Sequence, residues 1–147
     1  MSSNIFYKGQ VLWSQIYANR HLRHSAYAGF CAQARSNMLK QFGLSLDDFA
    51  RKKIGPILFR EELIYHREVR LDEEIQVSTL LSQYNIINGK FSFTHEILKS
   101  SGEIAATVHL DGAWLDLPTR KLTSLPEDWK SIIDKIPKTL DYIEINE

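Results

Sequence analysis

A polar loop with two histidines leads directly into a helical pattern between residues 17 and 42, which read YANRHLRHSAYAGFCAQARSNMLKQF. Imidazole exchanges its proton nearest neutral pH, so His21 and His24 are candidate general bases. Asn19 is a candidate for positioning water or a carbonyl group. A helix that begins at this loop presents free N–H groups and partial positive charge, which suit an anion or a polarised carbonyl. We therefore expect the chemistry of this protein to lie here.

The helix that must position these residues is predicted by apolar residues repeating at the spacing of one helical face between Tyr27 and Phe42. Ser25 can cap its start, and Gly43 supplies the left-handed residue that ends helices. A thiol on this face, that of Cys31, is predicted to be packed and not to act as a nucleophile. The buried face is predicted to comprise Tyr27, Phe30, Cys31, Ala34, Met38, Leu39 and Phe42.

A second helix and a strand follow. Ser45 opens the short helix LDDFARK, whose acidic residues lie in the first turn, where the helix dipole favours them. After the turn signal Gly55-Pro56, alternating apolar residues from Ile57 to Val69 predict a half-buried strand. Glu61 shares the apolar parity of this strand, which leaves two interpretations. Either the register is shifted, or its carboxylate faces the site and replaces an acid there.

Further strands are indicated by alternation with a period of two. We expect a strand or strand pair within 5–16, strands at 75–81, 91–97 and 103–117, and a C-terminal helix led by Pro126. One long helix followed by consecutive strands predicts an α+β protein with an antiparallel sheet packed on the helix. The sequence lacks the glycine-rich phosphate loops of nucleotide-binding folds.

Composition limits the partners. A chain of 147 residues with 44% hydrophobic residues predicts a single domain over residues 1–147. Eighteen basic residues balance eighteen acidic ones, and no basic run is interleaved with aromatic residues, so nucleic acid is not expected as a partner. His66, His95 and His109 lie on separate strand segments without metal-ligand spacing, so no metal site is expected.

The compartment is predicted from the same composition. No apolar run approaches membrane-spanning length, and the first residues, MSSNIFYKGQ, lack the pattern of a signal peptide. The single cysteine fits a reducing compartment. We therefore expect a cytoplasmic protein with no membrane span.

Nearly the whole chain resembles the hotdog-fold acyl-CoA thioesterases of the 4-hydroxybenzoyl-CoA thioesterase class. In that class a loop of the form D-x-N-x-H-x-N-N-x-x-Y or D-x-G-G-x-x-Y-H-x-x-Y precedes a helix reading YxxxFxxAR. Here the loop reads Tyr17-Ala-Asn19-Arg-His21-Leu-Arg-His24-Ser-Ala-Tyr27, and the helix continues through FCAQAR. The segments GPIL, REELIYHREVRLDEEIQV and AWLDLPTRKLTSLPEDW extend the resemblance in the same order. It implies a hotdog fold, an antiparallel β-sheet wrapped around one long central α-helix.

The resemblance also implies site residues. Asn19 and His21 match the asparagine and histidine of the first loop form, and His24 matches the histidine of the second. Some relatives lack the family's acid and are thought to rely on an asparagine, a tyrosine and an arginine of the helix region. Tyr27 and Arg35 occupy the corresponding helix positions here.

The main departure from the family is Tyr17, which stands where the catalytic aspartate is usual. A phenol cannot serve as a carboxylate base or nucleophile near neutral pH, so Tyr17 is expected to donate a hydrogen bond or line the pocket. The candidate catalytic residues are Tyr17, Asn19, His21, His24, Tyr27 and Arg35.

The function implied by the resemblance is an acyl-CoA or acyl-carrier-protein thioesterase. Such an enzyme releases a free acid and a thiol, works as a homodimer or homotetramer, and needs no cofactor, because the coenzyme A thioester is its substrate. Two alternatives remain: a non-hydrolytic acyl-CoA-binding protein, and an acyl hydratase or dehydratase, whose acid–base motif we do not find. Trp13, Phe30 and Trp114 can line an acyl pocket or fill the core equally well.

Overall fold

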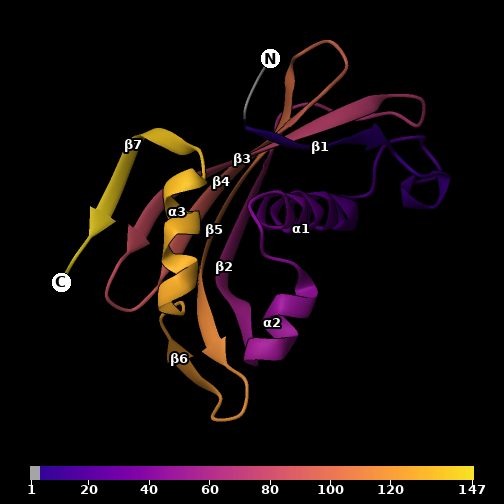
Figure 1. Cartoon of the computed structure of the whole chain (residues 1–147). Coiled ribbons are helices and arrows are strands. Elements are labelled where there is room, and N and C mark those ends of the chain that lie inside the picture. The colour runs from indigo at the N-terminus through magenta and orange to yellow at the C-terminus, as the bar shows by residue number, and fades with distance from the viewer. Residues whose placement is uncertain (1–3) are drawn as a thin grey trace.

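The computed structural model describes residues 4–147, and Figure 1 shows a curved sheet with two helices, α1 and α2, packed beside it. The helices are α1 (His24–Gln41), α2 (Leu46–Lys52) and α3 (Lys130–Lys135), with 3-10 turns η1 (Trp13–Gln15) and η2 (Glu127–Trp129). The strands are β1 (Ile5–Gln10), β2 (Ile54–Tyr65), β3 (Glu74–Asn85), β4 (Phe91–Leu98), β5 (Ile104–Asp116), β6 (Lys121–Thr123) and β7 (Lys138–Ile145).

All seven strands belong to one sheet, in which the neighbour order is β1-β3-β4-β5-β2. Off this path, β6 pairs with β5 and β7 pairs with β3. Within residues 4–147 the strand pairs are antiparallel, apart from the parallel pair of β3 and β7. The predicted antiparallel sheet is therefore confirmed, and β2 is left with an unpaired edge.

Helix α1 packs against the sheet through contacts with β1, β3 and β5. Its buried residues are Ala26, Tyr27, Phe30, Cys31, Ala34 and Met38, and Leu39 and Phe42 pack partly buried against the same core. The predicted buried face is thus confirmed. The predicted cap was wrong, because α1 begins at His24 with Arg23 as N-cap, and no side chain caps its first turn. Gly43 follows the helix with a φ of +104°, as its C-terminal position requires.

Helix α2 begins as the sequence predicts. The Ser45 hydroxyl accepts a hydrogen bond from the backbone N–H of Asp48, and the Asp48 carboxylate accepts one from the backbone N–H of Ser45. Two backbone donors at the helix start are satisfied by this reciprocal pair. Phe49 on this helix is buried against the rings of Trp114 and Trp129, which fixes α2 on the sheet.

Strand β2 differs from its sequence-based prediction in its bounds, because it begins at Ile54 and ends at Tyr65, before Val69. Gly55 and Pro56 lie inside the strand, so the predicted turn was wrong; an edge strand tolerates proline's missing N–H. The register against β5 shifts between Leu58 and Arg60, so an extra residue is accommodated there. Beyond this bulge Glu61 lies opposite Leu110, a fully buried residue, and shares its inward face. The register shift therefore holds, whereas the Glu61 side chain is exposed and lines no part of the cavity ahead of α1, so it does not replace an acid there.

The N-terminal and C-terminal parts of the chain contain elements that the sequence patterns did not predict. The first strand ends at Gln10 and gives way to η1, and both β6 and β7 were missed. Pro126 precedes η2 and α3, so the proline-led C-terminal helix is confirmed. The longest helix within residues 4–147 has 18 residues, and none of the helices there has the apolar length to cross a membrane.

Candidate active site

The polar loop ahead of α1 folds into a tight turn. The backbone N–H of Arg20 donates to the Tyr17 carbonyl at 2.8 Å, and the N–H of Tyr17 donates to the His21 carbonyl at 2.9 Å. Arg20 takes the left-handed conformation that closes this turn, with φ +68°. The Asn19 side-chain oxygen accepts a hydrogen bond from the backbone N–H of His21 at 3.2 Å. The turn therefore fixes Asn19 and His21 beside each other.

The segment between β2 and β3 holds this loop from the other side. The backbone N–H of Leu22 donates to the Val69 carbonyl at 2.7 Å, and His21 forms an antiparallel bridge with Arg70. Val69 is fully buried and anchors the segment. As a result the carboxylate of Glu68 reaches the imidazole of His21, with 2.8 Å between Oε2 and Nε2. Arg70 donates to the other carboxylate oxygen at 3.2 Å.

Aromatic side chains form the wall beside this pair. The His24 ring stacks on the ring of Tyr65, with 4.6 Å between the ring centroids. The rings of Tyr17 and His24 pack edge to face, with 6.0 Å between their centroids. Tyr27 meets Tyr65 in the same edge-to-face manner at 5.1 Å. Burial, and then the negative charges near it, raise the pKa of Tyr27 to about 12. Its phenol therefore stays protonated and can act as a hydrogen-bond donor.

Together these residues line a cavity of about 360 Å³, which we call the loop pocket. Five of the six predicted site residues contribute to it, and the connecting segment supplies the rest of the wall. Its lining residues are Tyr17, Asn19, His21, Leu22, His24, Tyr27, Tyr65, His66, Arg67 and Glu68. The uncapped N-terminus of α1 begins within this pocket at His24. An imidazole, its carboxylate partner and the N-terminus of a helix thus surround one space.

Arg35 is the predicted site residue that lies outside the loop pocket. It is 11 positions beyond His24 on α1, roughly 16 Å along the helix axis. Its guanidinium donates to Nε2 of His95 at 2.9 Å. Nδ1 of His95 donates to the Ser78 carbonyl at 2.9 Å, which leaves Nε2 as the acceptor. His95 is fully buried, and burial together with the Arg35 charge lowers its pKa to about 3.

This buried neutral imidazole predicts acid sensitivity of the fold. Below about pH 6.5 the unfolded chain protonates His95 while the folded chain does not, so stability is lost as pH falls from about 6.5 toward 3. The slope is about 1.4 kcal/mol per pH unit. Urea unfolding at pH 7.5 and pH 5.0 should show the parent losing about 2 kcal/mol more than His95→Gln, which has no imidazole to titrate. Equal losses in both proteins would contradict this assignment.

Other reactive groups do not add to the site. Burial raises the pKa of the Cys31 thiol to about 12, so it is not a thiolate nucleophile. Among residues 4–147, no cluster of three or more histidine, cysteine, aspartate or glutamate side chains is placed to hold a metal ion.

Two residues of the pocket, Glu68 and Tyr65, were missed by the sequence patterns. Glu68 lies 47 positions after His21 in a charged run, REVRLDEE, and no local spacing connects the two. That run has two apolar residues, Val69 and Leu71, and the structure shows that Val69 is the one that returns the segment to the core. Tyr65 was read only as a buried-face residue of a strand, although it stacks on His24.

The chain is similar to known proteins in both sequence and fold. The family model of the thioesterase-like superfamily matches residues 11–133. No curated protein matches the chain. Among solved structures, a hypothetical protein from Staphylococcus aureus in complex with CoA is 19% identical, with a TM-score of 0.84 over 97% of this chain and 92% of that one.

Two further solved structures are named thioesterases. The DHNA-CoA thioesterase from Staphylococcus aureus is 20% identical, with a TM-score of 0.81 over 90% of this chain and 89% of its own. The 1,4-dihydroxy-2-naphthoyl-CoA thioesterase from Synechocystis is 19% identical, with a TM-score of 0.78 over 93% of this chain and 97% of its own. At these identities the likeness establishes a shared fold.

Proposed function

Because the chain belongs to the thioesterase-like superfamily, we propose that it hydrolyses acyl thioesters of coenzyme A or of an acyl-carrier protein in the loop pocket. The observation that carries the proposal is the 2.8 Å contact between His21 Nε2 and Glu68 Oε2. Glu68 accepts the Nε2–H of His21 and so fixes the tautomer in which Nδ1 is free to take a proton. The solved relatives that bind CoA or are named CoA thioesterases support the substrate class.

In the proposed reaction, His21 removes a proton from water as its oxygen attacks the thioester carbon. The N–H groups at the start of α1 and the phenol of Tyr27 stabilise the negative charge that develops on the carbonyl oxygen. The carbon–sulfur bond then breaks, and the proton held by His21 passes to the leaving thiolate. One water is consumed, and a carboxylic acid and a free thiol are released. Asn19 holds the backbone of His21 and so positions the base.

We propose that Glu68 replaces the carboxylate that is missing at Tyr17. The loop lacks the family's aspartate, and the segment between β2 and β3 brings a carboxylate to the same pocket. In this proposal Tyr17 packs against His24 as part of the wall, and Arg35 lies outside the catalytic centre. We also interpret the fold as a hotdog fold, with the sheet wrapped around α1 as the central helix.

The assay for the proposal is release of free thiol from short, medium, long and aromatic acyl-CoAs. Thiol release supports hydrolysis. Retention of acyl-CoA without thiol release would instead favour a non-hydrolytic acyl-binding protein, and conversion of an enoyl-CoA to a hydroxyacyl-CoA would favour a hydratase. A cytoplasmic location and a single domain over residues 1–147 stay predictions.

We further propose that the active form is a homodimer assembled along the free edge of β2. This strand is 12 residues long, and its large apolar side chains Leu58, Phe59, Ile64 and Tyr65 are exposed. A long exposed strand edge with apolar side chains near both of its ends favours pairing with another strand, and a second copy satisfies it symmetrically. Tyr65 also lines the loop pocket, so a partner on this edge would cover the open side of the site.

Phe59→Glu is expected to convert the dimer to a monomer, because a carboxylate would be buried in the paired edge. Light scattering after gel filtration should give the parent a mass of twice the 17.0 kDa of one chain. The variant should have the mass of a single chain. Leu140→Glu is the matched control, since Leu140 is an exposed apolar residue of β7, and it should stay dimeric. A monomeric parent would contradict the proposal.

A further inference from the structure

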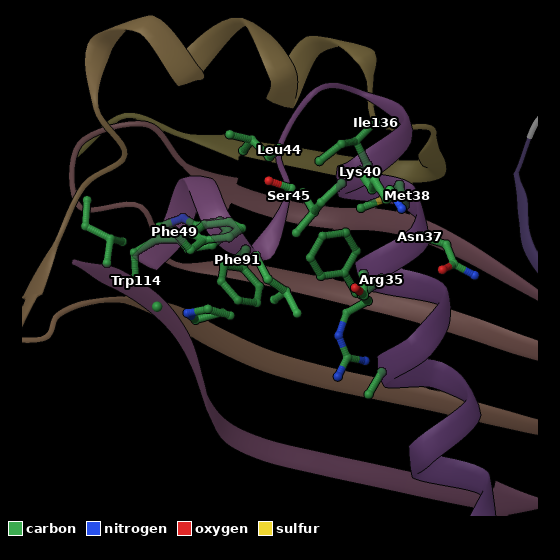
Figure 2. Close-up of a pocket in the computed structure, with 18 of the residues that line it drawn as sticks. Arg35, Asn37, Met38, Lys40, Leu44, Ser45, Phe49, Phe91, Trp114 and Ile136 are labelled. Carbon is green, nitrogen blue, oxygen red and sulfur yellow. The ribbon is translucent and has the colours of Figure 1, made fainter. Parts of the chain in front are cut away.

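A second and larger cavity lies at the C-terminal half of α1, with a volume of about 740 Å³. Residues from the three helices, from segments next to them and from the sheet line it, and Figure 2 shows some of them. Its inner wall is mostly apolar and aromatic, formed by Met38, Leu44, Phe49, Phe91 and Trp114. Close-packed cores leave no space of this size, whereas ligand pockets of 300–1,000 Å³ are common. The cavity, which is partly open to solvent, is therefore large enough for a small-molecule ligand.

Two cations line this apolar space, the exposed Lys40 and the partly buried Arg35. Figure 2 shows Arg35 reaching from α1 toward the sheet at one end of the cavity, while Phe49 and Trp114 lie toward the other end. A guanidinium has five N–H donors, and the acceptor described for it is Nε2 of His95. His95 is neutral, so it satisfies a donor without balancing the charge.

Arg35 also lacks a close anion. Within residues 4–147 no carboxylate lies within salt-bridge distance of its guanidinium, and Glu61 influences it only from farther away. Burial lowers the pKa of Arg35, which shows that its surroundings disfavour the charge. The carboxylate of a ligand would give the Arg35 guanidinium an anionic partner, through a charge-assisted pair of hydrogen bonds.

We propose that this cavity binds a single-chain fatty acid, with the carboxylate on Arg35 and the aliphatic chain along Phe91 toward Phe49 and Trp114. The charged end and the apolar wall together match an amphiphilic monoanion better than a neutral lipid or a polar anion. The cavity meets solvent beside its exposed lining residues, among them Lys40, Leu46 and Ala50. This binding goes beyond the proposed hydrolysis, because it uses no residue of the loop pocket and breaks no bond.

The test is calorimetric titration of the purified full chain with dodecanoate and with dodecanol, both below micelle formation. Dodecanoate should bind at least about tenfold more tightly than dodecanol. Arg35→Met should weaken dodecanoate binding about 10- to 100-fold and abolish the preference for the acid. Lys52→Met removes an exposed cation of α2 that does not line the cavity, and it should leave the preference intact.

Ala50→Trp provides a second variant at an exposed position that should not affect folding. The larger ring narrows the mouth and should reduce binding of both probes about tenfold or more. Equal affinity for acid and alcohol, full dodecanoate binding by Arg35→Met, or unchanged binding by Ala50→Trp would each overturn the proposal. The readout is binding alone, so this inference and the proposed thioesterase activity succeed or fail separately.

Discussion

His21→Ala is expected to lower kcat for acyl-CoA hydrolysis about 100- to 1,000-fold, because the variant loses the general base of the proposed reaction. His21 is partly exposed and contributes little to the core, so the variant should unfold at nearly the parent's urea concentration. The expected loss is therefore in turnover and not in the amount of folded protein. The measurement is steady-state thiol release, with KM and kcat determined separately.

Glu68→Gln should give a smaller loss in kcat, about 10- to 100-fold, because glutamine keeps the shape of the side chain and loses the charge that orients His21. His109→Ala is the control, since His109 lies on β5 and its imidazole contacts Thr94 outside the loop pocket. That variant should retain kcat within about threefold of the parent. Equal activity of His21→Ala, Glu68→Gln and His109→Ala would exclude the proposed pair.

Gly112→Ala is expected to lower the free energy of unfolding by about 2–3 kcal/mol, the largest effect on stability that we predict. A Cβ at this position would collide with the carbonyl oxygen of Ile57 on β2 and lie 2.7 Å from the Phe91 ring. Neither atom can move freely, because one is backbone of a paired strand and the other belongs to a buried ring. Gly112 lies opposite Leu58, directly beside the bulge in β2.

Gly29→Ala is the matched control for this prediction. Gly29 lies inside α1, and an added Cβ would meet no atom within 4 Å. Alanine is the better helix former, so this variant should gain about 0.5–1 kcal/mol. Urea unfolding of the two variants beside the parent measures both effects. A stable Gly112→Ala protein would show that β2 and β5 pack less closely than described.

Local chemistry explains what the sequence predicted well. The Ser45–Asp48 pair sets the start of α2, the helical spacing from Tyr27 onward identifies the buried face of α1, and Gly43 marks its end. These features depend on residues within a few positions of one another. Five predicted residues met in the loop pocket because they belong to one loop and the first turn of the helix that follows it.

What the sequence did not predict depends on contacts between distant segments. The bulge at Leu58 and Arg60 shifts parity in mid-strand, which alternation counted from one end does not reveal. Glu68 reaches His21 only because the buried Val69 holds its segment against the loop. Strand β7 pairs in parallel with β3, although its residues Leu140 and Ile143 are exposed and give no clear buried face.

The most direct test of the central claim is thiol release by the parent protein across the acyl-CoA series, with Tyr17→Asp assayed beside it. We predict turnover by the parent of at least one acyl-CoA, since Glu68 supplies the carboxylate that position 17 lacks. We expect that turnover to be lost in His21→Ala. If the parent released no thiol from any acyl-CoA and activity appeared only in Tyr17→Asp, the loop pocket would be a silenced site and the His21–Glu68 mechanism would be wrong.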